Sequence, residues 1–316
     1  MRRFVFAFAA AYLIFLSVVH ADDSSNIKPL PPVTMQDGNV FAPMRFAVIG
    51  RYAYFDQNRI FTGASEDDPG FGKRRRTAHA GQLTLRAGLP AGFEVLATGT
   101  LWDKTVEREN AKGATDESDV SGLGDIQLMV RYQLLSQKNG APLSLAAGLG
   151  LEIPTGDCDN ENSFGTQPYF GPFLQLGTGA WTPKATMSAT RVFGRSRLDG
   201  QLMYVLGTEG EHHIEKGDQF LYNLGYGYAL NSFLTAGLAL NGIHQDKNTQ
   251  ELSPGVIGHD PNSGCDLIFL GPELSWNIKP WNTVLGLALP VSVYRDMEGS
   301  QPTEDYRLVA KIAVRF

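Results

Sequence analysis

Two cysteines and a short acidic stretch are the residues of this chain best suited to metal or redox chemistry. Cys158 and Cys265 could form a disulfide in an oxidising compartment, or both could remain free thiols. Around the first of them, "GDCDNEN" places Asp157, Asp159 and Glu161 at alternate positions, as at the start of a calcium loop. The stretch lacks the glycine and the distal glutamate of a complete EF-hand loop, so we predict no metal here.

Histidines and serines offer little for catalysis. His212 and His213 stand beside Glu211, but adjacent histidines point to opposite sides of a strand, which favours an exposed loop over a metal site. His244 and Ser253 share one polar segment without an ordered acid–His–Ser arrangement, and neither G-x-S-x-G nor H-E-x-x-H occurs. We therefore predict no catalytic residue and no cofactor.

The elements that would position any site are strands. In the final segment, Leu308, Ile312 and Val314 share one face of a strand, while Arg307 and Lys311 lie on the other. A soluble β-sandwich would turn the apolar face to its core, whereas a barrel in lipid would turn it outward and keep the charges in a wet lumen. The number and connection of the strands decide between these two folds.

About twelve segments alternate in this way, each near the 9–11 residues that a membrane-spanning strand needs. They are residues 44–56, 76–88, 92–103, 124–136, 142–153, 166–179, 183–207, 218–230, 232–243, 266–278, 282–294 and 304–316. Short links rich in Gly, Pro and Asn take turns with longer charged links; the short ones are 89–92, 136–141, 180–182, 231–232 and 279–281. This rhythm predicts an all-β, up-and-down antiparallel transmembrane barrel of about twelve strands.

One segment fits this scheme poorly. Residues 183–207 are about twice the required length, and their apolar parity shifts from odd to even positions. A bulge near Gly194 in one long strand would explain the shift, and so would a separate hairpin that raises the count to fourteen. We favour twelve strands because the long and short links then stay in phase.

The lumen lining follows from the parity opposite to the apolar face. A lipid-facing arginine at mid-depth would cost about 2–4 kcal/mol, so charged side chains should point inward. The predicted lining is Arg51, Arg86, Glu94, Arg131, Glu152, Glu273 and Lys311, with the apolar Ile49, Leu96, Met129 and Leu221 on the same side. These charges could either line a selective passage or fill a closed barrel with salt bridges.

The two ends of the chain point to export. Residues 1–21 have two arginines, an apolar run and a small-residue cleavage pattern ending at Ala21, as a secretory signal peptide does. Residues 22–43 are proline-rich and would form a periplasmic lead or a lumen plug, so the barrel would span 44–316. The terminal aromatic, Phe316, is typical of the sorting signal that barrel-insertion machinery reads. A net charge of −6 excludes nucleic-acid binding by bulk charge.

Several glycine-rich motifs resemble those of a known family. "SGLGDIQLMVRYQLL" (121–135), "LAAGLGLEIPTGD" (145–157), "GPFLQLG" (171–177) and "LGPELSW" (270–276) resemble the outer-membrane family described as the MetA pathway of phenol degradation. The resemblance covers most of the expected mature chain and implies a barrel for uptake of aromatic or other hydrophobic compounds. Independently of the family, Asp125 and Asp157 suit bonds to backbone amides where strands begin or end.

Together these features predict a non-enzymatic channel or transporter for small hydrophobic or aromatic compounds in the bacterial outer membrane. A structural or adhesive barrel with a plugged lumen is one alternative, and a lipid hydrolase that uses His244 and Ser253 is another. The expected partners are outer-membrane lipid, lipopolysaccharide near the "KRRR" of 73–76, the insertion machinery and a small hydrophobic substrate.

Overall fold

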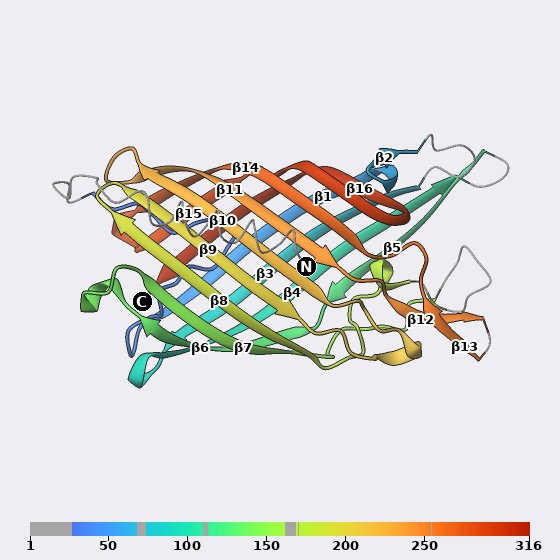
Figure 1. The fold of residues 1–316 in the computed structure, drawn as a ribbon, viewed down its shortest axis with the longest axis horizontal. Coiled ribbons are helices and arrows are strands. Elements are labelled where there is room, and N and C mark those ends of the chain that lie inside the picture. Colours follow the sequence, from blue (N-terminus) through green and yellow to red (C-terminus); the bar gives the residue numbers. More distant parts are fainter. Residues whose placement is uncertain (1–26, 68–73, 110–112, 162–168, 170, 254) are drawn as a thin grey trace.

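Twelve antiparallel strands close into a barrel in the computed structural model, which describes residues 27–67, 74–109, 113–161, 169, 171–253 and 255–316 (Figure 1). The strands are β1 Phe46–Gly63, β2 Ser65–Glu66, β3 Arg74–Gly88, β4 Phe93–Glu109, β5 Thr115–Leu123, β6 Ile126–Leu135, β7 Ser144–Ile153, β8 Thr182–Phe193, β9 Ser196–Val205, β10 Gln219–Ala229, β11 Leu234–Gln245, β12 Thr249–Ser253, β13 Val256–His259, β14 Cys265–Ile278, β15 Thr283–Ala288 and β16 Val291–Arg315. Single 3₁₀ turns are η1 Pro90–Gly92, η2 Gln137–Asn139, η3 Pro172–Leu174, η4 Glu211–His213 and η5 Lys279–Trp281.

Two of the twelve wall positions are each built from two consecutive segments. β5 and β6 both pair with β4 and together form one strand interrupted at residues 124–125. β15 and the first residues of β16 both pair with β14, with a break at residues 289–290. The rest of β16 then returns along β15 and β1, and this last pairing closes the sheet on itself.

Both ends of the barrel sequence meet at the end that carries the short links. Phe46 and Phe316 exchange two backbone hydrogen bonds, of 3.2 and 2.9 Å, where β1 begins and β16 ends. In Figure 1 the C-terminus therefore lies at the end opposite to the β12–β13 hairpin, which belongs to a long link. Closure leaves no open edge, which hydrocarbon would not tolerate.

The predicted strand count is correct, but two of the predicted segments are wrong and their errors cancel. Residues 166–179 form no strand in their described part; residues 172–174 are η3, and Pro172 and the glycines around it disfavour a ladder. Residues 182–205 instead form the hairpin of β8 and β9, which turns at Gly194 with a left-handed φ of 53°. The parity shift in 183–207 marks this turn, and residues 180–182 end a long link rather than form a short one.

The outward face of the wall is the apolar one. Large side chains exposed along it include Leu128, Val130, Leu149, Leu287 and Ile312, each from the parity predicted to meet lipid. The opposite parity supplies the polar interior, so alternation along each strand separates lipid from lumen as expected. Among the described residues, no helix is long and apolar enough to cross a membrane.

An arginine on the outward face should destabilise the barrel according to its depth. We expect Leu149→Arg, in the middle of β7, to lower the free energy of unfolding in lipid bilayers by about 2–4 kcal/mol, and Leu230→Arg, in a short link, by at most about 1 kcal/mol. Denaturant titrations of protein refolded into vesicles would measure both values. Equal losses for the two variants would contradict a lipid-facing belt.

Candidate functional site

An extended N-terminal segment, residues 27–41, lies inside the barrel and forms neither helix nor strand. Inward-facing side chains accept hydrogen bonds from its backbone amides at 2.7–3.2 Å; in chain order of the amides, the acceptors are Thr235, Glu273, Gln201, Thr190, Gln133 and Glu94. These acceptors come from β11, β14, β9, β8, β6 and β4, so the segment passes across much of the wall. The wall thus satisfies peptide groups that would otherwise lack partners away from water.

A close approach fixes part of this path. A Cβ atom on Gly38 would lie 2.5 Å from the backbone oxygen of Ser144, so only glycine fits between the segment and the wall there. Of the two alternatives that the sequence left open for residues 22–43, a lead outside the barrel or a plug within it, the described residues 27–41 lie within it.

A buried ion network anchors the middle of the segment. Arg131 and Glu94 are fully buried, and Arg131 Nη1 lies 2.7 Å from Glu94 Oε1. Arg86 Nε donates to the second oxygen of Glu94 at 2.8 Å. The network satisfies both oxygens of a carboxylate that would be costly to bury alone.

Asp37 of the segment joins this network to a second one. Its carboxylate lies 3.1 Å from Arg197 Nη2 and 3.7 Å from Arg86 Nη2. Arg197 also donates to buried Asp199 at 2.8 Å, and the Thr190 hydroxyl donates to the same carboxylate at 2.5 Å. The negative charge of Asp37 therefore interacts with arginines on two separate parts of the wall.

A second clamp holds the earlier part of the segment. Glu273 accepts hydrogen bonds from the amides of residues 33–34 at 2.9 and 3.0 Å, while Arg51 and Lys311 donate to carbonyl oxygens of the same stretch. Glu152 instead pairs with a lysine of β8 nearer the long links. All seven residues that the sequence assigns to the lumen therefore face the interior or contact the segment in it.

Sequence reasoning missed several charged residues of this interior. They include Glu304, Asp37, Lys184, Arg197 and Asp199. The last three lie in the segment that was read as one long strand, so their parity could not be assigned before the turn at Gly194 was known. Asp37 lies in the proline-rich stretch, where no periodicity exists to orient a side chain.

The lumen beside the segment contains a cavity of about 500 Å³. Apolar side chains such as Ile49, Phe55 and Leu221 line it together with cationic ones such as Arg51 and Lys311. Of the apolar residues predicted to point inward, Leu96 also lines this cavity. A cavity of this size and mixed lining is within the range of small-molecule sites.

At the long-link end, Asp125 fixes the loops over the barrel mouth. Its Oδ1 accepts the amides of Thr155 and Gly156 at 3.0 and 2.9 Å, and its Oδ2 accepts the amide and hydroxyl of Thr178 at 2.8 and 2.9 Å. Asp157 Oδ1 similarly accepts the amide of Asp159 at 2.9 Å. The two motif aspartates therefore bind backbone amides, as the sequence predicts.

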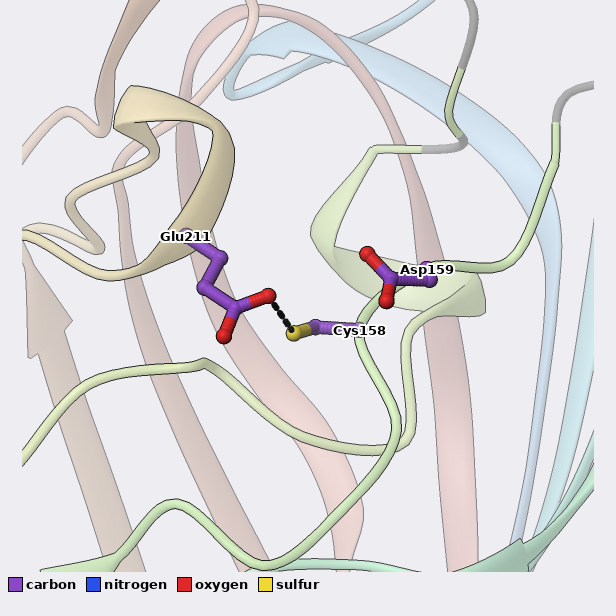
Figure 2. Close-up of side chains that lie close together, drawn as sticks. All are labelled: Cys158, Asp159 and Glu211. Atoms are coloured by element: carbon purple, nitrogen blue, oxygen red, sulfur yellow. Dashed lines mark hydrogen bonds between the residues drawn. The ribbon is translucent and has the colours of Figure 1, made fainter.

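The link that Asp125 fixes and the turn η4 bring a thiol and two carboxylates together (Figure 2). Ligand atoms of Cys158, Asp159 and Glu211 lie within 4.8 Å of one another, and the thiol donates to Glu211 Oε2 at 3.2 Å. His212 Nε2 lies 2.8 Å from Asp159 Oδ1, and its ring stacks on Tyr169 at a centroid distance of 3.8 Å. Sulfur, carboxylate and imidazole are donor types that bind zinc, although the sequence analysis predicts no metal.

The electrostatics of this cluster keep the thiol protonated. Burial, together with the carboxylate of Glu211, raises the pKa of Cys158 to about 12. A protonated thiol is a poor nucleophile and a poor metal ligand.

The two cysteines are both free, so the disulfide considered from sequence is not formed in the structure. They line different cavities: Cys158 lines one of about 260 Å³ under the loops, while Cys265 lines another near the start of β14. Cys265 packs there against a cluster that contains Phe61 and Phe269. Both cysteines lie near the long links, but this does not bring their sulfur atoms together. A disulfide requires closely matched positions of the two Cβ atoms.

The remaining polar motifs have ordinary partners. His244 Nδ1 lies 2.8 Å from Asp266 Oδ1, and His213 Nδ1 lies 2.7 Å from Glu209 Oε1. The Ser253 side chain lies outside the described part of the chain. Of the "KRRR" residues, Lys73 is also outside it, and Arg75 forms an ion pair of 2.8 Å with Asp56.

Comparisons with known proteins agree with this architecture. A sequence profile described as "Putative MetA-pathway of phenol degradation" matches residues 67–312, and no curated protein matches the chain. The crystal structure of the COG4313 outer membrane channel from Pseudomonas putida F1 is similar with a TM-score of 0.66 at 15% identity, over 90% of this chain and 100% of that one. The transport unit of the Escherichia coli autotransporter AIDA-I gives 0.46 at 10% identity, over 98% and 97% of the two chains. The first likeness shows the barrel fold.

Removal of the Asp37 charge should loosen the segment in the lumen. We expect Asp37→Asn to speed amide hydrogen exchange in residues 33–41 by about tenfold, because Arg86 and Arg197 lose their shared anion. Exchange followed by mass spectrometry would measure this, with Asp246→Asn in an exposed link as the matched control. Unchanged exchange in Asp37→Asn would contradict the anchoring role of the ion network.

Proposed function

The chain belongs to the family described as "Putative MetA-pathway of phenol degradation", and we propose that it is an outer-membrane channel for the passive passage of small hydrophobic or aromatic molecules. The observation that carries this proposal is the lumen cavity of about 500 Å³ with its mixed apolar and charged lining. Apolar patches give a hydrophobic solute a favourable surface, while polar groups keep the passage wet. Conduction requires such moderate binding rather than tight capture.

A bacterial outer-membrane location is part of the proposal. It is supported by the apolar outward face, the signal-peptide pattern of residues 1–21 and the terminal aromatic. Phe316 is 63% exposed at the closing strand pair, where insertion machinery could read it. Arg74 and Arg75 are exposed near the long links and suit lipopolysaccharide phosphates.

We propose that the chain is not an enzyme. The histidine considered for lipid hydrolysis, His244, shares the outward parity of Leu238 on β11, and its ring nitrogens lie 2.8 Å from Asp266 Oδ1 and 3.3 Å from Asp246 Oδ1. Both ring nitrogens thus face carboxylates. A serine nucleophile would have to displace one carboxylate to bond the ring. Loss of lipid hydrolysis in His244→Ala would revive the enzymatic alternative.

A structural barrel with a plugged lumen is the second candidate, because the N-terminal segment makes many bonds to the wall. Glu273, Arg131 and Asp37 all take part in holding it. If the segment never leaves, solutes must pass through the cavity beside it. If it does leave, the passage widens, and the same residues would regulate flow.

Conductance measurements separate these two functions. We expect the full chain to give small single-channel currents in planar bilayers, and a variant without residues 27–43 to give currents several-fold larger, because the segment occupies lumen cross-section. Asp37→Asn combined with Glu273→Gln should give an intermediate increase at unchanged chain length.

Folding of each variant should be checked by its heat-modifiable migration on gels before any recording. Uptake of a radiolabelled neutral aromatic compound by cells with and without the gene provides a second readout. A folded, truncated barrel without conductance, together with unchanged uptake, would support the structural barrel instead.

A further inference from the structure

The closing strand pair carries a row of cations on its lumen side. Arg51 of β1 lies directly opposite Lys311 of β16, and Phe55 lies opposite Arg307. Arg315 continues the same inward parity toward the short-link end. Positions four residues apart on a strand are separated by about 13 Å, so these side chains form steps along the length of the lumen. We call Arg51, Arg307, Lys311 and Arg315 the seam cations.

The cavity beside the N-terminal segment is strongly cationic. Its described lining includes all four seam cations with Arg86 and Lys184, and the carboxylate of Asp37. Arg86 and Lys184 already face the carboxylates of Glu94 and Glu152. Arg307 likewise pairs with the buried carboxylate of Glu304. Among the described residues, the cations of this lining that form no ion pair are Arg51, Lys311 and Arg315, all of them at the seam.

Two of the seam cations bind only uncharged groups through the hydrogen bonds found in the described part of the chain. Arg51 donates to the carbonyl of Val33 at 3.2 Å, and its buried Nε has no hydrogen-bond partner. Lys311 donates to the carbonyl of Pro32. The wall carboxylate of Glu273, which binds the same stretch of the segment, accepts hydrogen bonds from segment amides at both of its oxygens. A guanidinium with an unused donor beside an ammonium group is suited to a carboxylate ligand.

Aromatic rings accompany the cations. The guanidinium of Arg307 lies 4.2 Å from the ring centroid of Phe269 and 5.9 Å from that of Phe55. Both rings line the same cavity as Arg51 and Lys311. A ligand that carries an aromatic ring could therefore contact Phe55 or Phe269 while its charged end meets the cations.

From this arrangement we propose that the seam binds small aromatic monocarboxylates and conducts them along the lumen. The inference rests on the proposed channel function and specifies its substrate class: an aromatic ring with one carboxylate, rather than an uncharged aromatic compound. The ring contacts Phe55 and Phe269, and the carboxylate moves between the seam cations. Successive weak sites of this kind allow both entry and release.

Equilibrium binding to the detergent-solubilised full chain tests the site without requiring conduction. We expect benzoate to bind, and Lys311→Gln and Arg51→Gln each to weaken that binding by about tenfold. Lys279→Gln removes the same charge from an exposed short link and should leave binding unchanged. Benzamide, which has the ring without the charge, and acetate, which has the charge without the ring, should both bind far more weakly than benzoate.

Several outcomes would overturn the inference. These are no benzoate binding by a folded protein, equal binding of benzamide or acetate, or equal losses in Lys279→Gln and Lys311→Gln. Bilayer recordings then separate the inference from the function on which it rests. Benzoate binding in a barrel that never conducts would retain the site and reject the channel. Conductance without benzoate binding would retain the channel and reject the seam.

Discussion

The structure depends on one constraint: each backbone amide and carbonyl in hydrocarbon must find a partner within the protein. At the barrel seam β1 meets this requirement by pairing with β16 from Ala47 to Gly63, and Phe46 and Phe316 extend the pairing by two hydrogen bonds. Without that pairing, β1 and β16 would each present an unpaired edge to lipid. Closure also fixes which side chains face each other across the seam, so the pairing of Arg51 with Lys311 follows from the same constraint.

Closure and alternation together place many charged side chains inside the barrel, where each of them needs a partner. Each strand that turns an apolar side chain to lipid must turn its neighbour inward, and many of these neighbours are charged. The N-terminal segment supplies some of these partners. Its peptide groups bind Glu273, Arg51 and Gln133, and its Asp37 forms ion pairs with two arginines. The segment thus occupies the lumen and also provides bonding partners for the wall. The seam is the region where the segment offers carbonyl oxygens rather than a full negative charge.

Much of the fold could be predicted because period-two alternation and link length are local properties. The parity of Leu308 and Ile312 identified the lipid face, and the same parity placed Arg51, Arg86, Glu94 and Lys311 inside. Gly194 was recognised as a point of irregularity, yet a bulge and a hairpin turn leave the same parity shift in a sequence. The strand assigned to 166–179 failed because an apolar, glycine-rich link resembles a strand when its backbone partners are unknown. The amides of Leu176 and Gly177 bind the carbonyl of Asp157 instead.

The sequence by itself determined the all-β class, the lipid-facing side and the inward parity of the charged residues on correctly assigned strands, since each depends on neighbouring positions along one strand. Only the tertiary structure decided that residues 27–41 lie in the lumen, that Cys158 meets Glu211 rather than Cys265, and which cations retain unpaired donors. These outcomes depend on distances between parts of the chain more than fifty residues apart. Local alternation carries no information about such distances, and a closed barrel fixes them only when every strand pair is in register.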